Sequence, residues 1–329
     1  MPPLFEWRAT RTDVVLRAMA IASVVFNHTR LVTFGGGAAF LLMLSGMNFA
    51  RFAIKDGTAP GIRRSILDMG RQVFVPSLAL VLLSFALYRK FDVLELLFVR
   101  NWYALQTIAA FPVWWVQMFL QLLAGLYLLL WIPAIVRGTI RRPALAMLVF
   151  FGVGLFLRAA GALLTIPLLT GPRLPLSHLW TFALGAVVYF CAVDTTTSRS
   201  GTIWLPAACV LAGTIVGFDF GTWQYWWVTI AGLLLVRVKY IPLPHVVARV
   251  TTTVSAATFG IFLTHMLWFR AVSGVTKMWA GPDAIAHPLV LFFFSLLLGT
   301  ATFAAFVAFG RAYRALQSEP VRPLPAIAT

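Results

Sequence analysis

The chain has 329 residues, of which 60% are hydrophobic and only 11% are charged, whereas a soluble domain carries about 25% charged residues. That balance excludes a soluble fold, because the apolar residues are too many to bury in a core, and it predicts an integral membrane protein. The formal net charge of +16 would suit nucleic-acid binding in a soluble protein. In a membrane protein Lys and Arg collect in cytoplasmic loops, so we expect no nucleic-acid partner.

Apolar stretches of about 16 to 25 residues recur along the chain and predict an all-α, polytopic membrane helical bundle of about ten transmembrane helices. We expect one domain, residues 1–329, with short cytoplasmic tails at 1–12 and 312–329 and an uncleaved first span. Residues 89–111 could hold a re-entrant or interfacial helix. The expected spans lie at roughly 13–33, 37–54, 72–88, 112–136, 144–163, 177–193, 202–218, 222–237, 254–273 and 287–309.

The distribution of basic residues between the expected spans sets the orientation. With the N-terminus inside, the cytoplasmic segments gather most of the Lys and Arg residues. The opposite loops hold few: Arg89, Lys90, Arg100, Arg173 and Lys277. The asymmetry predicts that both termini are cytoplasmic, as expected for a multi-pass protein of a cell inner membrane.

The first expected helix carries three polar residues that lipid should reject, Asp13, Arg17 and His28. An ionisable residue inside a membrane is costly unless it faces protein or water, so each is a candidate site residue. Arg17 and His28 are about three turns apart on one helix face, separated by about 16 Å along the axis. Asp13 could pair with Arg17 or cap the helix start. The alternatives are an arginine that snorkels to the interface and a histidine bonded to another helix.

Other polar residues lie in later expected spans. Ser45 and Gly46 allow either close helix packing or close approach of a ligand. Arg158 lies in the fifth span with no acidic residue nearby in sequence. His265, in the ninth span, would alone be structural, but beside His28 it becomes a second candidate.

The remaining histidines and cysteines have simpler interpretations. His178, His245 and His287 fall at the ends of expected spans or in loops, and we interpret them as mostly structural. Cys191 and Cys209 lie in or near apolar segments and offer neither metal-binding spacing nor a disulfide framework. We therefore expect no metal site.

The first two expected helices resemble acyltransferase family 3, a family of integral membrane acyltransferases. Its first helix has Asp, Arg and His with the spacing of Asp13, Arg17 and His28. Its second helix ends in Ser-Gly-Phe, where this chain has Ser45 and Gly46 followed by Met.

Two later segments resemble the same family. Arg71 and Pro76 match an Arg followed by a Pro that opens the third helix. Near its end the family has Tyr-x-x-Tyr-Leu-x-His, where this chain has Phe259, Phe262 and His265, so the tyrosine hydroxyls are missing.

The resemblance implies transfer of an acyl group, often acetyl, from cytoplasmic acetyl-CoA or another acyl-CoA to a hydroxyl of a glycan or glycolipid. It suggests His28 as the base or as a transient acyl carrier, with Arg17 on the donor side. The acceptor and the oligomeric state stay open. We expect substrate contacts from Asp13, Ser45, Trp115, Arg158 and His265, and contacts with the phosphates of the coenzyme from a basic loop at 51–71 through Arg63, Arg64 and Arg71. Positive-inside topology alone would also produce that charge.

Two other functions compete with acyl transfer. A transporter or flippase of a small molecule or lipid-linked sugar would also place Arg and His inside the membrane. It predicts paired broken helices in two related halves, which the sequence does not show. A non-catalytic membrane scaffold gives no reason for the spacing of Arg17 and His28.

Overall fold

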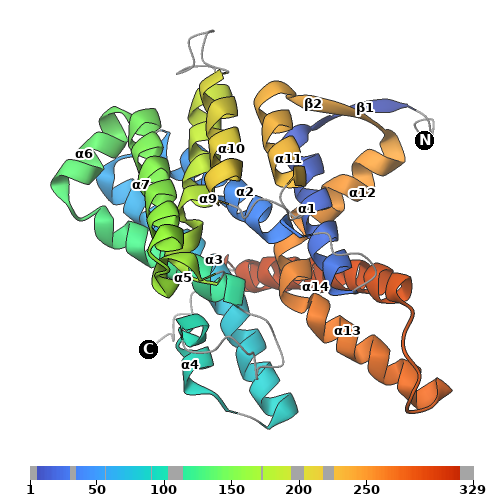
Figure 1. Ribbon diagram of the computed structural model, residues 1–329. Helices are drawn as coiled ribbons and strands as arrows, with labels where there is room; N and C mark the ends of the chain where they lie inside the picture. The colour runs from blue at the N-terminus through green and yellow to red at the C-terminus, as the bar shows by residue number, and fades with distance from the viewer. Residues whose placement is uncertain are drawn as a thin grey trace, which may run out of the picture.

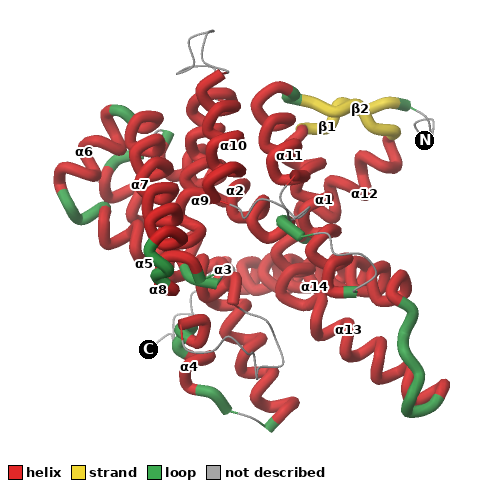
Figure 2. The backbone as a smooth tube through the Cα atoms, in the orientation of Figure 1, coloured by secondary structure: helices red, strands yellow, loops and turns green. Residues whose placement is uncertain are grey.

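The computed structural model describes residues 6–29, 35–55, 57–89, 91–102, 114–171, 173–193, 204–217 and 226–318. Helices dominate this part of the chain, and a small two-stranded sheet lies at one edge (Figures 1 and 2). The helices are α1 (Thr12–His28), α2 (Gly37–Phe49), α3 (Ala59–Tyr88), α4 (Val93–Leu96), α5 (Trp114–Leu129), α6 (Pro133–Arg141), α7 (Pro143–Leu163), α8 (Pro167–Thr170), α9 (Pro175–Val188), α10 (Trp204–Gly217), α11 (Trp226–Arg237), α12 (His245–Ala256), α13 (Thr258–Ala280) and α14 (Pro288–Ser318). Short π-helical turns, Ala50–Ile54 and Tyr189–Val193, extend α2 and α9.

The helices confirm an all-α membrane protein. Within the described residues four helical segments are long and apolar enough to cross a membrane alone, and up to six if each bent pair is one span. Each of the expected spans overlaps a helix of the structure. The full set of ten spans, with both termini in the cytoplasm, stays a prediction.

Helix α3 corrects the expectation of a basic loop at 51–71. The helix begins at Ala59, where the Thr58 hydroxyl accepts a hydrogen bond from the Gly61 amide, 3.3 Å away, and a proline follows in the first turn. Proline and a Thr cap favour a helix start at this point. Pro76 therefore lies inside α3 and does not open it. Arg63, Arg64 and Arg71, expected in a loop, are helical.

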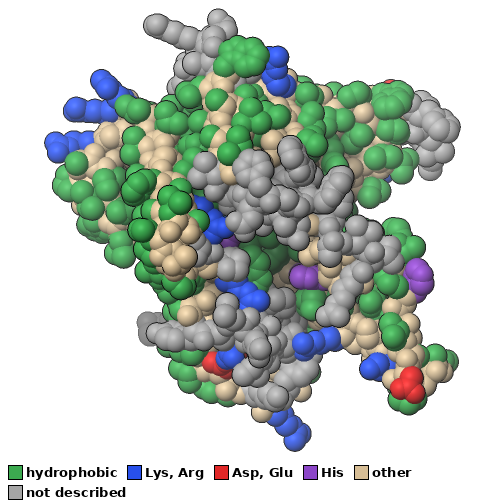
Figure 3. All heavy atoms as spheres, viewed as in Figure 1, with side chains coloured by type: hydrophobic (Ala, Val, Ile, Leu, Met, Phe, Trp, Pro, Cys, Tyr) green, Lys and Arg blue, Asp and Glu red, His purple; other side chains and the backbone are tan. Residues whose placement is uncertain are grey.

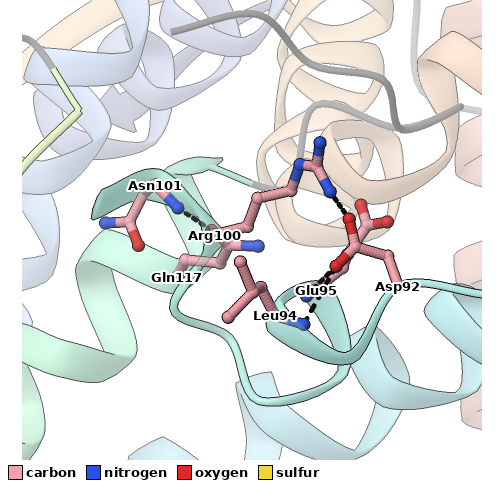
Figure 4. Close-up of polar contacts among 6 residues, drawn as sticks. All are labelled: Asp92, Leu94, Glu95, Arg100, Asn101 and Gln117. Carbon is pink, nitrogen blue, oxygen red and sulfur yellow. Dashed lines mark hydrogen bonds and ion pairs between the residues drawn. The ribbon is translucent and has the colours of Figure 1, made fainter. Parts of the chain in front are cut away.

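The segment between α3 and α5 holds a polar network (Figure 4). Asp92 caps α4 by accepting hydrogen bonds from the backbone amides of Leu94 and Glu95, and it forms an ion pair with Arg100. The Asn101 amide donates to the Gln117 side chain on α5, 2.9 Å away. A four-residue helix cannot cross a membrane. Residues 103–113 of the expected re-entrant segment lie outside the described residues.

A crossing of α2 and α9 forms the packed centre of the bundle. A Cβ at Gly46 would overlap the carbonyl oxygen of Phe182, and a Cβ at Gly185 would overlap that of Met43. The two glycines thus let the backbones of the two helices touch. Gly46 serves helix packing, which was one of the two interpretations of the Ser45–Gly46 pair.

Part of the segment 1–12, which was expected to be a short cytoplasmic tail, forms a strand. Strand β1 (Trp7–Arg11) pairs antiparallel with β2 (Tyr240–Pro244), with Trp7 opposite Pro244 and Arg11 opposite Tyr240. The Thr12 amide then donates to the Lys239 carbonyl oxygen, 3.1 Å away. The sheet fixes the start of α1 against the segment between α11 and α12 (Figure 1).

Candidate active site

The structure brings His28 and His265 together from distant parts of the sequence. Their imidazole rings stack nearly in parallel, with the ring centroids 5.0 Å apart and 9° between the planes. His28 is in the last turn of α1, and His265 is near the middle of α13. Centroid distances of about 4.5–7 Å are typical of attractive ring contacts.

His265 is held in one tautomer by its own helix. Its Nδ1 lies 2.7 Å from the Phe262 carbonyl oxygen and 3.2 Å from that of Ile261, so Nδ1 carries the proton and donates it. The Nε2 atom then presents a lone pair. The residue is only 2% exposed, and Nε2 has no hydrogen-bond partner among the described residues. An orphaned buried nitrogen is unusual in a folded protein and indicates a ligand, a water or a catalytic role.

Aromatic side chains surround the histidine pair. The Phe262 ring lies 5.9 Å from the His265 ring and 5.0 Å from the Trp115 ring of α5. Phe269 meets His265 edge-on at 6.0 Å. The Trp115 indole N–H donates to the Ala38 carbonyl oxygen of α2, 3.2 Å away. Trp115 therefore packs against the aromatic ring that contacts His265, and its expected contact with substrate stays a prediction. Phe262 keeps the ring of the family's tyrosine without its hydroxyl.

Arg17 and Asp13 are on the same helix as His28 but do not pair as closely as the sequence allowed. The Asp13 carboxylate accepts two hydrogen bonds from Arg11, at 2.9 and 3.0 Å. Asp13 is in the first turn of α1, and the N-cap residue of that helix is Arg11, which makes no side-chain capping bond. The charges of Asp13, Arg11 and Arg51 act on Arg17. Arg17 is half-buried, and Asp13 is the first of these charges, but one carboxylate among Arg11, Arg17 and Arg51 leaves the region with a net positive charge.

The remaining candidates have other contacts. The Ser45 hydroxyl donates to the Leu41 carbonyl oxygen within α2, 2.9 Å away. The Arg63 guanidinium lies over the Trp131 ring, 4.1 Å from its centroid. Arg64 and Arg71 are exposed on α3, and Arg158 is half-buried on α7, a helix that packs along α9. The structure therefore gathers His28, His265 and Trp115 around one site. The roles of these five residues in substrate and coenzyme binding stay predictions.

Two contributors on the C-terminal helices escaped the sequence analysis. The Ser295 hydroxyl of α14 reaches the His265 carbonyl oxygen at 3.5 Å. The Trp268 indole nitrogen, one turn after His265, is buried without a hydrogen-bond partner among the described residues. Its position three residues after His265 was the available signal, because side chains with that spacing share a helix face.

The face of the molecule in Figure 3 is hollowed near its centre, and histidine and Lys or Arg side chains are visible around the hollow.

Metal binding would need several ligands close together. Within the described part of the chain no three His, Cys, Asp or Glu side chains form such a group.

The fold and the stacked histidine pair define a helical membrane protein with a polar site inside an apolar bundle. The family model for acyltransferase family 3, described as an acyltransferase domain, matches residues 15–309, so the chain belongs to this family. This confirms the resemblance of the first two helices and makes the protein a multi-pass membrane acyltransferase. No curated protein and no solved structure matches the chain.

Proposed function

We propose that the protein moves an acyl group, acetyl in the first instance, from cytoplasmic acyl-CoA to a hydroxyl of a glycan or glycolipid on the opposite side of a cell inner membrane. The stacked pair of His28 and His265 carries this proposal. It places two imidazoles in an apolar bundle, where a neutral imidazole can take a proton from a hydroxyl.

His28 is the group that meets the acceptor hydroxyl. It is half-buried, whereas His265 is almost fully buried, so a ligand reaches His28 more easily. As the hydroxyl oxygen attacks the thioester carbonyl carbon, His28 takes the hydroxyl proton. The tetrahedral intermediate then expels the coenzyme thiolate, and His28 gives the proton to that thiolate. In the alternative scheme His28 attacks first and carries the acyl group itself.

We assign Arg17 to the side of the site that the acyl donor reaches. It is about 16 Å from His28 along the helix axis, and a positive region favours the phosphates of a coenzyme. Arg64 and Arg71 lie about two turns apart on one face of α3, exposed. We propose that these two receive the nucleotide phosphates, with Arg63 held aside by Trp131.

The expected substrate contacts differ in what their side chains bond. The rings of Trp115 and His265 lie on either side of Phe262, and we assign both residues to the acceptor pocket. The Ser45 hydroxyl is bonded to its own helix, so we assign it no contact with the acceptor. The packing position of Gly46 explains why small residues occur at this point of α2.

The test is acyl transfer by purified protein in liposomes, with labelled acetyl-CoA and a cell-envelope glycan fraction as acceptor. His28→Ala should lower transfer by about 100-fold or more, the range that general base catalysis supplies. His287→Asn is the matched control. His287 is exposed, and its ring accepts a hydrogen bond from the Leu289 amide that Asn can also accept. If the His28→Ala protein acylates glycan at the wild-type rate, the scheme is wrong. A labelled adduct on His28 in the absence of glycan would select the acyl-carrier scheme.

A further inference from the structure

Two buried polar atoms on α13 have no partner among the described residues: Nε2 of His265 and Nε1 of Trp268. The first is a hydrogen-bond acceptor, because the proton of His265 is on Nδ1. The second is an indole N–H, which can only donate. The helix therefore presents one free acceptor and one free donor at neighbouring positions.

The helix geometry puts the two side chains on one surface. Residues three apart on an α-helix lie about 60° apart around the axis, with Cβ atoms about 5–6 Å apart. Trp268 also lies almost directly in line with Ile261, whose backbone packs against Gly299 of α14. Trp268 is thus on the face of α13 that lies toward α14, next to the face that meets His28.

Residues of α1 and α14 pack around this part of α13. Phe26 of α1 meets Phe292 of α14 edge-on, with centroids 5.3 Å apart. The Ser295 hydroxyl reaches the His265 carbonyl oxygen. The two unpartnered nitrogens therefore lie where α1, α13 and α14 meet, and leaving both unsatisfied there costs free energy that an occupant would recover.

A hydroxyl group matches this pair of atoms, because it donates one hydrogen bond and accepts others. We assign it to a different hydroxyl from the one that His28 activates. Hydrogen bonds to imidazole nitrogens lie in the ring plane, and the rings of His28 and His265 stack in nearly parallel planes with centroids 5.0 Å apart. The nitrogens of the two rings therefore lie in separate planes, which suits two separate oxygen atoms.

We propose that His265 Nε2 and the Trp268 N–H bind a second hydroxyl of the acceptor, next to the hydroxyl that His28 activates. The inference rests on the proposed acyl transfer and adds a selective element to it: the site favours acceptors with two neighbouring hydroxyls over single alcohols. Trp268 is a binding residue in this scheme, and it takes no proton.

Trp268→Phe tests the inference because it removes the N–H and keeps most of the ring. Trp279→Phe is the control, on the same helix but 83% exposed. In the liposome assay with labelled acetyl-CoA, Trp268→Phe should raise the glycan concentration for half-maximal transfer about tenfold, the effect of one hydrogen bond. The Tm in detergent should fall below that of the control only by the packing that the smaller ring loses, because Trp268 is half-buried.

Unchanged glycan dependence in Trp268→Phe would overturn the inference while leaving acyl transfer intact. A wild-type protein that transfers nothing to glycan would instead count against the proposed function.

Discussion

The imidazole of His265 lies parallel to that of His28, with ring centroids 5.0 Å apart, although the two residues belong to helices near opposite ends of the chain. The first ring is almost fully buried and fixed by the backbone of α13, while the second is half-buried at the end of α1. Because the His265 ring is fixed, the stacked His28 ring, which a ligand can reach, is held in a defined orientation. Such preorganisation is what a base needs to meet a hydroxyl in the correct geometry.

Arg17→Gln should weaken use of the donor and leave use of the acceptor unchanged. The substitution removes a half-buried cation whose nearest acid, Asp13, is paired with Arg11. We expect the KM for acetyl-CoA to rise about tenfold, the loss of one charge-assisted contact. Steady-state transfer at varied acetyl-CoA and at varied glycan separates the two effects. Arg8→Gln, at an exposed position of β1, is the control. An increase in the glycan requirement alone would place Arg17 at the acceptor end instead.

Gly46→Ala should destabilise the bundle more than a glycine substitution at an uncrowded helix position. The added Cβ would overlap the Phe182 backbone, which cannot move aside as a flexible side chain would. Overpacking of this kind costs typically about 1–3 kcal/mol, and the backbone contact puts Gly46 at the upper end. The Tm in detergent and the monodisperse fraction after purification measure it.

Gly274→Ala on α13 is the matched control, because nothing lies within 4 Å of a Cβ at that position. There the substitution should be neutral or slightly stabilising, since Ala favours helix over Gly. Equal Tm values for the two variants would show that α2 and α9 do not touch through Gly46.

The first helix could be predicted from the sequence because helical periodicity alone places Arg17 and His28 on one face. The meeting of His28 with His265 could not be derived from periodicity, since it depends on how α1 and α13 pack. The family pattern suggested His265 as a candidate, and the structure supplied the stacking and the tautomer. Trp268 was missed because a lone tryptophan in an apolar span looks like ordinary packing.

The errors have local causes. Positive charge at Arg63, Arg64 and Arg71 suggested a loop, but Arg favours helix and Thr58 with the following proline starts one. Arg11 looked like part of a tail, yet its side chain pairs with Asp13 and its strand pairs with β2. In both cases a short-range contact decided the structure where charge patterning had been used to predict topology.

Glu95 should make the segment 91–102 sensitive to pH. It lies in α4, outside the membrane-spanning helices, and burial raises the pKa of its carboxyl from 4.5 to about 7. An acid whose pKa is raised by folding holds its proton more tightly when folded, so its contribution to stability is complete below about pH 4.5 and is lost as the pH rises toward 7. Hydrogen exchange of this segment, corrected for intrinsic rates, should show less protection at pH 7.5 than at pH 5.

Glu95→Gln should remove most of that difference and raise protection at pH 7.5, whereas Asp283→Asn, at an exposed position, should change neither. Equal protection of the wild-type segment at the two pH values would mean that Glu95 is ionised in the folded protein, with its charge balanced beside the pair of Asp92 and Arg100.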